Sequence, residues 1–162
     1  SGKTTLLNIL NGKLTDYDGS VQFAGKELSL LSGRELREHI LYMDQIPYLF
    51  EGTIRENITL DEDFSNEQIQ QALKASNLDE VVRNDAGRLL SGGQRQRVSL
   101  ARGLVRGKKI ILLDEGTSSL DEKSALEIEN QLIKNDELTV LMITHQLRES
   151  IRKQLNQVIF LS

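Results

Sequence analysis

The sequence has 162 residues, of which 38% are apolar and 27% charged, a composition that predicts one soluble globular domain with its own hydrophobic core. The formal net charge of −4 argues against a general nucleic-acid binder, and the absence of cysteine excludes disulfides and thiolate metal sites. The longest apolar runs are far shorter than the about 20 residues of a membrane-spanning helix, so we expect any transmembrane partner to lie outside this segment. The first residue is Ser1, with no initiator methionine or apolar leader, which we interpret as a truncation.

In chain order, four short apolar runs bounded by polar segments predict buried strands of a parallel sheet. These runs are Ile40 to Met43, Ile110 to Leu113, Thr139 to Ile143 and Val158 to Leu161. Helical patterns lie between them and begin after the capping residues Ser65, Ser91 and Asp121. Strands that alternate with helices predict an α/β fold. We expect a core formed by residues 1–45 and 107–162, with a mainly helical insert over about 46–106.

The chain opens on Ser1-Gly2-Lys3-Thr4-Thr5, which matches the end of a phosphate-binding loop that runs into a helix. In such a loop, backbone N–H groups hold phosphate oxygens, Lys3 reaches the β- and γ-phosphates, and the Thr4 hydroxyl ligates Mg²⁺. The early glycines of the motif are absent, and the same residues would also suit an ordinary helix start. The motif alone therefore leaves both interpretations open.

Two adjacent carboxylates, Asp114 and Glu115, follow directly after the predicted strand from Ile110 to Leu113. Open α/β sheets bind ligands just beyond the carboxyl ends of their strands, so this position suits a ligand site. Asp114 suits a partner of Mg²⁺, and Glu115 suits a base for water. Two adjacent acids are more often a helix cap and its solvated neighbour. Their combination with Lys3 and Thr4 favours a nucleoside triphosphate site.

A second glycine-containing motif, Leu90-Ser91-Gly92-Gly93-Gln94, lies at the start of another predicted helix. A hydroxyl and two backbones without side chains at a helix N-terminus form a site for an anion. The simpler alternative is a flexible Gly-Gly turn. A turn does not explain why a single domain has two phosphate-binding helix starts.

With its flanks up to Asp121, this pentapeptide resembles the signature motif of ABC transporter ATP-binding domains, and the resemblance covers nearly the full chain. It implies a RecA-like P-loop NTPase core with a mostly parallel sheet and an inserted helical subdomain. It also implies two such domains paired head to tail. Ser91 and Gly93, within the motif that includes Gly92 and Gln94, would then contact the γ-phosphate of ATP bound at Lys3 of the partner subunit.

The resemblance assigns roles to three further residues. Gln45 matches a glutamine that ligates Mg²⁺ and senses the membrane domain, and His145 matches a histidine that touches the γ-phosphate. Asp121 ends the segment Ser118 to Asp121, which matches the loop that crosses the dimer interface. A lone glutamine or histidine would carry little weight. What supports the assignment is that these residues follow the family order: Lys3, Gln45, Ser91, Asp114, Asp121, His145.

The segment from Leu49 to Ile58 resembles one that is typical of exporter-type members, although Ile54 and Ile58, four residues apart, also suit an amphipathic helix on the core. Both interpretations can hold together. Several features depart from the family pattern. Asp44 and Ile46 flank Gln45 where exporters commonly have other residues. Gly116 stands where alanine or proline is usual, and the stretch from Asn77 to Leu90 is shorter and lacks an acidic run.

The sequence thus predicts Mg²⁺-dependent ATP hydrolysis that powers export by a membrane-domain partner, at the cytoplasmic face of a membrane. The resemblance implies that Glu115, His145 and Gln45 are catalytic. One alternative is an ABC ATPase of the translation or DNA-repair type, against which the exporter-type segment argues. Another is a non-catalytic, nucleotide-gated interaction module, which would require a broken site. Without the early glycines, we expect the 162 residues alone to bind ATP poorly.

Overall fold

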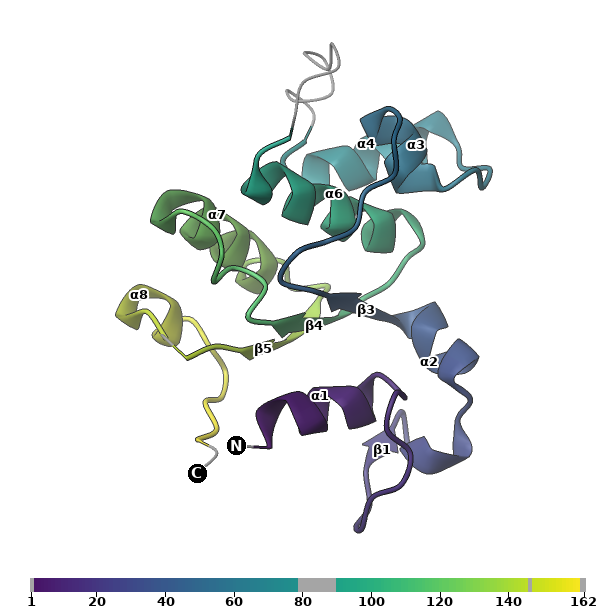
Figure 1. Ribbon diagram of the computed structural model, residues 1–162, viewed down its shortest axis with the longest axis vertical. Helices are drawn as coiled ribbons and strands as arrows, with labels where there is room; N and C mark the ends of the chain where they lie inside the picture. Colours follow the sequence, from purple (N-terminus) through teal and green to yellow (C-terminus); the bar gives the residue numbers. More distant parts are fainter. Residues whose placement is uncertain (1, 79–89, 146, 161–162) are drawn as a thin grey trace.

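The computed structural model describes residues 2–78, 90–145 and 147–160 and contains a parallel three-stranded sheet (Figure 1). Its order is β3 (Ile40–Met43), β4 (Ile110–Asp114), β5 (Thr139–Ile143), so β4 lies in the centre. The register pairs Ile40 with Ile110, and Ile110 with Thr139. A short antiparallel pair, β1 (Gln22–Phe23) and β2 (Lys26–Glu27), stands apart from this sheet. The three predicted parallel strands and the α/β fold class are confirmed.

The prediction of a fourth strand from Val158 to Leu161 is wrong for residues 158–160, which form no strand, and Leu161 lies outside the described residues. A strand needs a neighbour that supplies backbone hydrogen bonds. Val158 and Phe160 instead line a cavity beside Val140 and Met142 of β5. Ile159 and Phe160 are 66% and 80% exposed, so their apolar character does not reflect burial in a sheet.

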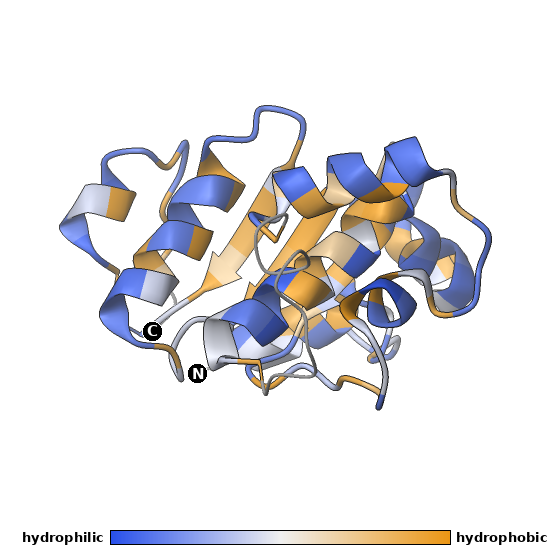
Figure 2. Cartoon of the chain, turned by 90° about the horizontal axis from the view of Figure 1, so that it is seen from above, coloured by the Kyte–Doolittle hydropathy of each residue, from blue (hydrophilic) through white to orange (hydrophobic). Residues whose placement is uncertain are grey.

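Helices cover both faces of the parallel sheet. Successive strand residues point to opposite sides, so the apolar strands have two hydrophobic faces that helices bury. On one face, Leu112 packs with Leu7 of α1 (Lys3–Leu10) and Leu36 of α2 (Gly33–His39). On the other face, Ile111 and Leu113 pack against α6 (Gly92–Val105) and α7 (Glu122–Ile133). In Figure 1, α6 and α7 lie above the sheet and α1 below it. Figure 2 shows the hydrophobic strands between helices with hydrophilic outer turns.

A close contact brings α6 onto the sheet at Gly103. A Cβ atom at this position would lie only 2.5 Å from Cδ2 of Leu41, which belongs to β3. Any side chain would therefore push α6 away from the strand. This contact fixes the helix that begins with the Ser91 motif against the sheet that carries the predicted carboxylates.

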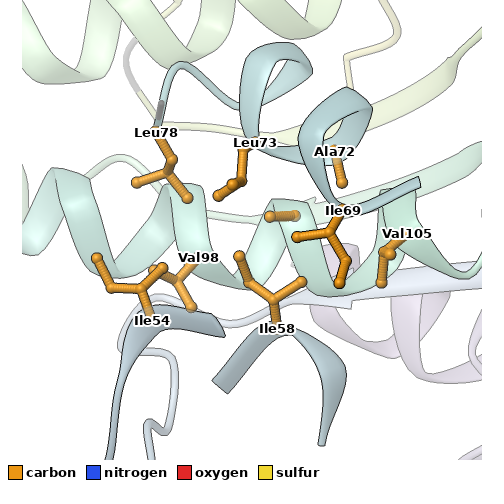
Figure 3. Packing of buried hydrophobic residues seen from close by; sticks show 9 residues of the cluster. Ile54, Ile58, Ile69, Ala72, Leu73, Leu78, Val98 and Val105 are labelled. Carbon is orange, nitrogen blue, oxygen red and sulfur yellow. The ribbon is translucent and has the colours of Figure 1, made fainter. Parts of the chain in front are cut away.

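Three helices form a second core, which we call the helical cluster. They are α3 (Ile54–Thr59), α4 (Asn66–Ala75) and α6. Their buried core has nine residues, of which eight lie on the three helices and the ninth is Leu78. Figure 3 shows these residues, with Ile58 pointing toward α6. The predicted amphipathic helix with Ile54 and Ile58 and the predicted helix after Ser65 are both confirmed.

The remaining elements are the 3₁₀ turn η1 (Leu28–Leu30) and α8 (Glu149–Arg152). Among the described residues, the helices are all too short or too polar to cross a membrane. The shortened stretch from Asn77 to Leu90 lies almost entirely outside the described residues.

Candidate functional site

The three parallel strands end at one side of the sheet, which we call the carboxyl edge: residues 44–45 after β3, 115–119 after β4 and 144–145 after β5. The register pairs Met43 with Leu113, and Asp114 with Ile143, so the three strands end side by side. The backbone N–H of Glu115 donates to the carbonyl oxygen of Ile143, 3.1 Å away. The sheet therefore brings together the residues that the sequence places beyond separate strands.

Glu115 and His145 are in direct contact, with 2.8 Å between Oε1 of Glu115 and Nε2 of His145. Their side chains are 36% and 66% exposed. A carboxylate only accepts hydrogen bonds, so Nε2 is the protonated nitrogen of the imidazole in this contact. For His145 to contact a phosphate, either its Nδ1 must bind the phosphate or Nε2 must exchange Glu115 for the phosphate.

The backbone of Glu115 is in the left-handed region, with φ of 49°, which costs energy in a residue other than glycine. The next residue, Gly116, packs closely, because a Cβ there would lie 2.3 Å from Cδ1 of Leu113. An alanine would therefore clash with the strand residue beneath it. Glycine at this position therefore lets the loop after β4 lie close to Leu113.

Asp114 accepts a hydrogen bond on Oδ2 from the hydroxyl of Tyr42, 2.9 Å away. Burial, followed by the bond to Asp114, raises the pKa of Tyr42 above its ordinary value, so the hydroxyl stays protonated and keeps donating. Sequence reasoning missed Tyr42. The register of the sheet shows why the two residues meet: Tyr42 pairs with Leu112, and Asp114 lies two residues further on the same face.

Gln45 is bonded to the loop after β4 and to α6. Its Nε2 donates to Oγ of Ser118 at 3.0 Å, and its carbonyl oxygen accepts from Oγ of Ser119 at 3.3 Å. The buried side chain of Gln96, on α6, donates from Nε2 to the carbonyl oxygens of Asp44 and Gln45. Ser118, Ser119 and Asp121 were predicted as one loop, whereas the contact from Gln96 was not predicted.

Lys3 lines a cavity of about 700 Å³ together with Thr144 and His145. Apolar residues of β5 and of the segment 158–160 form much of its wall. Gly2 is the N-cap of α1, and Thr4 and Thr5 are exposed in its first turn. The structure therefore brings two residues that were predicted to contact phosphate, Lys3 and His145, to a single cavity.

The Ser91 motif lies on the opposite face of the sheet from α1, at the N-terminus of α6 (Figure 1). Ser91 caps α6: its Oγ accepts from the backbone N–H of Gln94 at 3.2 Å, and Oε1 of Gln94 accepts from the N–H of Ser91 at 2.8 Å. Gly92 lies against Leu120 of the loop after β4, and Gly93 lies against Ser124 in the first turn of α7, because a Cβ at either glycine would meet these side chains. The motif is thus separated from Lys3 of the same chain.

Asp121 caps α7 by accepting a hydrogen bond from the N–H of Ser124, 3.0 Å away. Hydrogen bonds from Ser124 hold the pKa of Asp121 below its ordinary value. The capping role that the sequence predicted for Asp121 is confirmed. Ser124, which Asp121 caps, also faces Gly93 of the Ser91 motif.

A buried ion pair joins the loops after β4 and β5, and sequence reasoning missed it. Glu129 of α7 is only 3% exposed. It accepts from Oγ1 of Thr117 at 2.6 Å and from NH1 of Arg148 at 2.8 Å and 2.9 Å. Thr117 follows Glu115 and Arg148 follows His145, so this network links the two segments that carry the exposed Glu115–His145 pair.

The sheet with its carboxyl edge, the helix beginning at Lys3 and the capped Ser91 motif are those of an ATP-binding domain. A family model described as ABC transporter matches residues 1–118, and the chain belongs to this family as a nucleotide-binding domain.

The chain is similar to several curated transporters. It is 37% identical to the sophorolipid transporter of Starmerella bombicola over 100% of this chain and 14% of that protein. It is 38% identical to the glutathione/L-cysteine transport system ATP-binding/permease protein CydD of Haemophilus influenzae over 98% of this chain and 28% of that protein. It is 35% identical to ABC multidrug transporter E of Aspergillus fumigatus over 90% of this chain and 13% of that protein. The chain therefore spans less than a third of the length of each relative.

Proposed function

We propose that this chain binds ATP with Mg²⁺ and hydrolyses it to power export of a substrate across a membrane. The observation that carries the proposal is the contact between Glu115 and His145 at the carboxyl edge, next to Asp114 and beside the cavity that Lys3 lines. A positioned carboxylate, a histidine and a lysine beside one cavity suit attack of water on a phosphate. Family membership and the names of the relatives support the same function.

The donor set of the site fits Mg²⁺. Asp114, Gln45 and Thr4 would hold the ion through a carboxylate, an amide and a hydroxyl oxygen, all ligands that hard cations prefer. Among the described residues there is no group of three or more histidines, cysteines, aspartates or glutamates that could hold a metal without other ligands. The three ligands Asp114, Gln45 and Thr4 suit an ion such as Mg²⁺, which keeps water and phosphate oxygens in its coordination shell. Bound there, Mg²⁺ would neutralise charge on the phosphates.

In the proposed reaction, each of these residues has a separate role. Lys3 and the backbone N–H groups from Gly2 to Thr5 bind the phosphates at the N-terminus of α1. Glu115 accepts a proton from the attacking water as the P–O bond to ADP breaks, and His145 orients Glu115 and contacts the γ-phosphate. The hydrogen bond from Tyr42 to Oδ2 orients the carboxylate of Asp114, which would ligate Mg²⁺.

A second copy of the domain completes the site in this proposal. Ser91, Gly92, Gly93, Gln94 and Asp121 would close over the ATP of a head-to-tail partner. The positions of these residues support this arrangement. The Ser91 motif lies at α6 on one face of the sheet, whereas α1 and Lys3 lie on the other face. One chain cannot place both groups on a single nucleotide unless they move a long way, whereas two antiparallel copies can.

The proposal also includes a transmembrane partner, which places the domain at the cytoplasmic face of a membrane. Ile46, Tyr48 and Phe50 are large, exposed apolar residues in the loop that leads from Gln45 to α3. Exposed apolar side chains gathered in one segment are typical of a surface that another protein covers. We assign residues 1–45 and 107–162 to the ATP-binding core and about 46–106 to the helical subdomain that bears this surface.

The 162 residues alone should bind ATP weakly and therefore hydrolyse it weakly. They carry the Lys3 to Thr5 end of the phosphate-binding motif without the preceding glycines that the family uses to present backbone N–H groups. Calorimetry with Mg-ATP tests this. Binding by the 162-residue chain as tight as binding by a chain that includes these glycines would contradict it.

The shared site is tested by mixing two defective variants, made in the longest coding sequence that contains these residues. Lys3→Ala and Ser91→Arg should each abolish ATP hydrolysis, because every site in the homodimer then lacks one part. A mixed dimer has one intact site, so phosphate release should return. Activity that stays at background, with mixed dimers demonstrated by cross-linking, would contradict the head-to-tail arrangement.

A further inference from the structure

Gln96 joins α6 to the carboxyl edge through a single buried amide. Its side chain is 0% exposed, and its Nε2 lies 2.8 Å from the carbonyl oxygen of Asp44 and 3.0 Å from that of Gln45. These acceptors are more than 50 residues away in the sequence. A buried amide that gives up such partners finds no water to replace them, so the contact is costly to break.

Gln45 is held from a second direction by the loop after β4. Ser119 donates to the carbonyl oxygen of Gln45, and Nε2 of Gln45 donates to Ser118. The backbone of Gln45 is therefore fixed by α6 and by residues 118–119, and the side-chain nitrogen is engaged as well. An amide ligates a hard cation through its oxygen. With Nε2 directed at Ser118, Oε1 is the atom that remains for a cation.

We propose that Gln96 is a positioning residue for Gln45. By holding the carbonyls of Asp44 and Gln45, it sets the direction in which Oε1 of Gln45 faces Mg²⁺ bound with ATP. This inference rests on the proposed function, in which Gln45 is a ligand of that ion. Gln96 lies on α6, the helix that Ser91 caps. A movement of α6 would therefore shift Gln45 and change the affinity of the site for the cation.

The chain offers a matched control for a substitution at Gln96. Gln131, on α7, also donates through Nε2 to a backbone carbonyl, that of Ala75, more than 50 residues away. Within the described residues, Oε1 of Gln96 and Oε1 of Gln131 are both buried without a hydrogen-bond partner. Gln96→Met and Gln131→Met therefore each remove a side-chain amide that donates to a backbone carbonyl distant in the sequence, and replace it with an apolar chain of similar length.

The experiment measures Mn²⁺ binding by electron paramagnetic resonance, in the presence of a non-hydrolysable ATP analogue and in the longest coding sequence that contains the chain. Gln96→Met should weaken Mn²⁺ binding roughly 10- to 100-fold, the usual effect of removing a residue that orients a metal ligand. Affinity for the analogue in EDTA should stay unchanged. Gln131→Met should match the wild type in both measurements. Gln96→Glu keeps the shape but turns an oxygen toward the two carbonyls, so Mn²⁺ binding should fall in this variant too.

A third variant separates failure of this inference from failure of the proposed function. Gln45→Leu removes the proposed ligand directly and should weaken Mn²⁺ binding on its own. If Gln45→Leu weakens binding while Gln96→Met and Gln96→Glu behave like Gln131→Met, the positioning role of Gln96 is wrong. If Gln45→Leu leaves Mn²⁺ affinity unchanged, the proposed role of Gln45 is wrong, and the inference falls with it.

Discussion

The helical cluster is held together by buried apolar side chains, whereas the carboxyl edge consists of polar side chains joined by hydrogen bonds. In the cluster, Ile58 is fully buried. Arg102 donates to the carbonyl oxygen of Asn57 in α3 and to that of Tyr48 in the loop before α3, both at 2.6 Å. At the edge, Glu115 and His145 are partly exposed, and the Glu115 backbone is left-handed.

This difference separates residues that stabilise the chain from residues that act on a ligand. Substitutions in the cluster should change the free energy of unfolding, because they remove packing that no solvent replaces. Substitutions at Glu115 and His145 should change binding or hydrolysis with little effect on unfolding, because these two side chains already contact water. The following predictions test that division, beginning with the largest expected change in stability.

Ile58→Ala should lower the free energy of unfolding by about 2–5 kcal/mol, because it leaves a cavity between α3 and α6. Urea unfolding followed by circular dichroism measures the change. The control is Ile46→Ala, since Ile46 is 75% exposed and its loss leaves no cavity. Equal effects of the two substitutions would show that the helical cluster is not a packed core.

Arg148→Met should lower the free energy of unfolding by about 1–3 kcal/mol, because it leaves the carboxylate of Glu129 buried without its cation. Adding Glu129→Gln should recover part of the loss, since the amide oxygen still accepts from Thr117 and no charge remains. A double variant that is less stable than Arg148→Met would contradict this account of the network.

Ser65→Ala and Ser91→Ala should each lower the free energy of unfolding by about 1 kcal/mol, since both serines cap a helix through the same pair of hydrogen bonds. Only Ser91→Ala should also reduce ATP hydrolysis, because Ser91 is proposed to contact ATP. Phosphate release and thermal melts separate the two effects. Equal loss of activity in both variants would show that the Ser91 motif acts through the fold alone.

Local patterns in the sequence predicted the elements that neighbouring residues determine. The three parallel strands and the helix starts at Ser65, Ser91 and Asp121 follow from apolar periodicity and capping residues. The wrong strand at Val158 has the same origin, since an apolar run does not reveal whether a neighbouring strand is available to pair with it.

The contacts missed by sequence reasoning all join residues far apart in the chain. Tyr42 meets Asp114 across 72 positions, Gln96 meets Asp44 across 52, and Arg148 meets Glu129 across 19. None of these residues differs in its local pattern from an ordinary surface or core residue. The left-handed backbone of Glu115 and the tight packing of Gly116 against Leu113 are likewise visible only in the fold.

The central claim is that the carboxyl edge performs hydrolysis, and Glu115→Gln tests it most directly. The substitution keeps the side chain's size and removes the proposed base, so phosphate release should fall roughly 10²- to 10⁴-fold. Affinity for a non-hydrolysable ATP analogue and the thermal melting temperature should match the wild type. Wild-type phosphate release from Glu115→Gln, in a preparation free of other ATPases, would contradict the account.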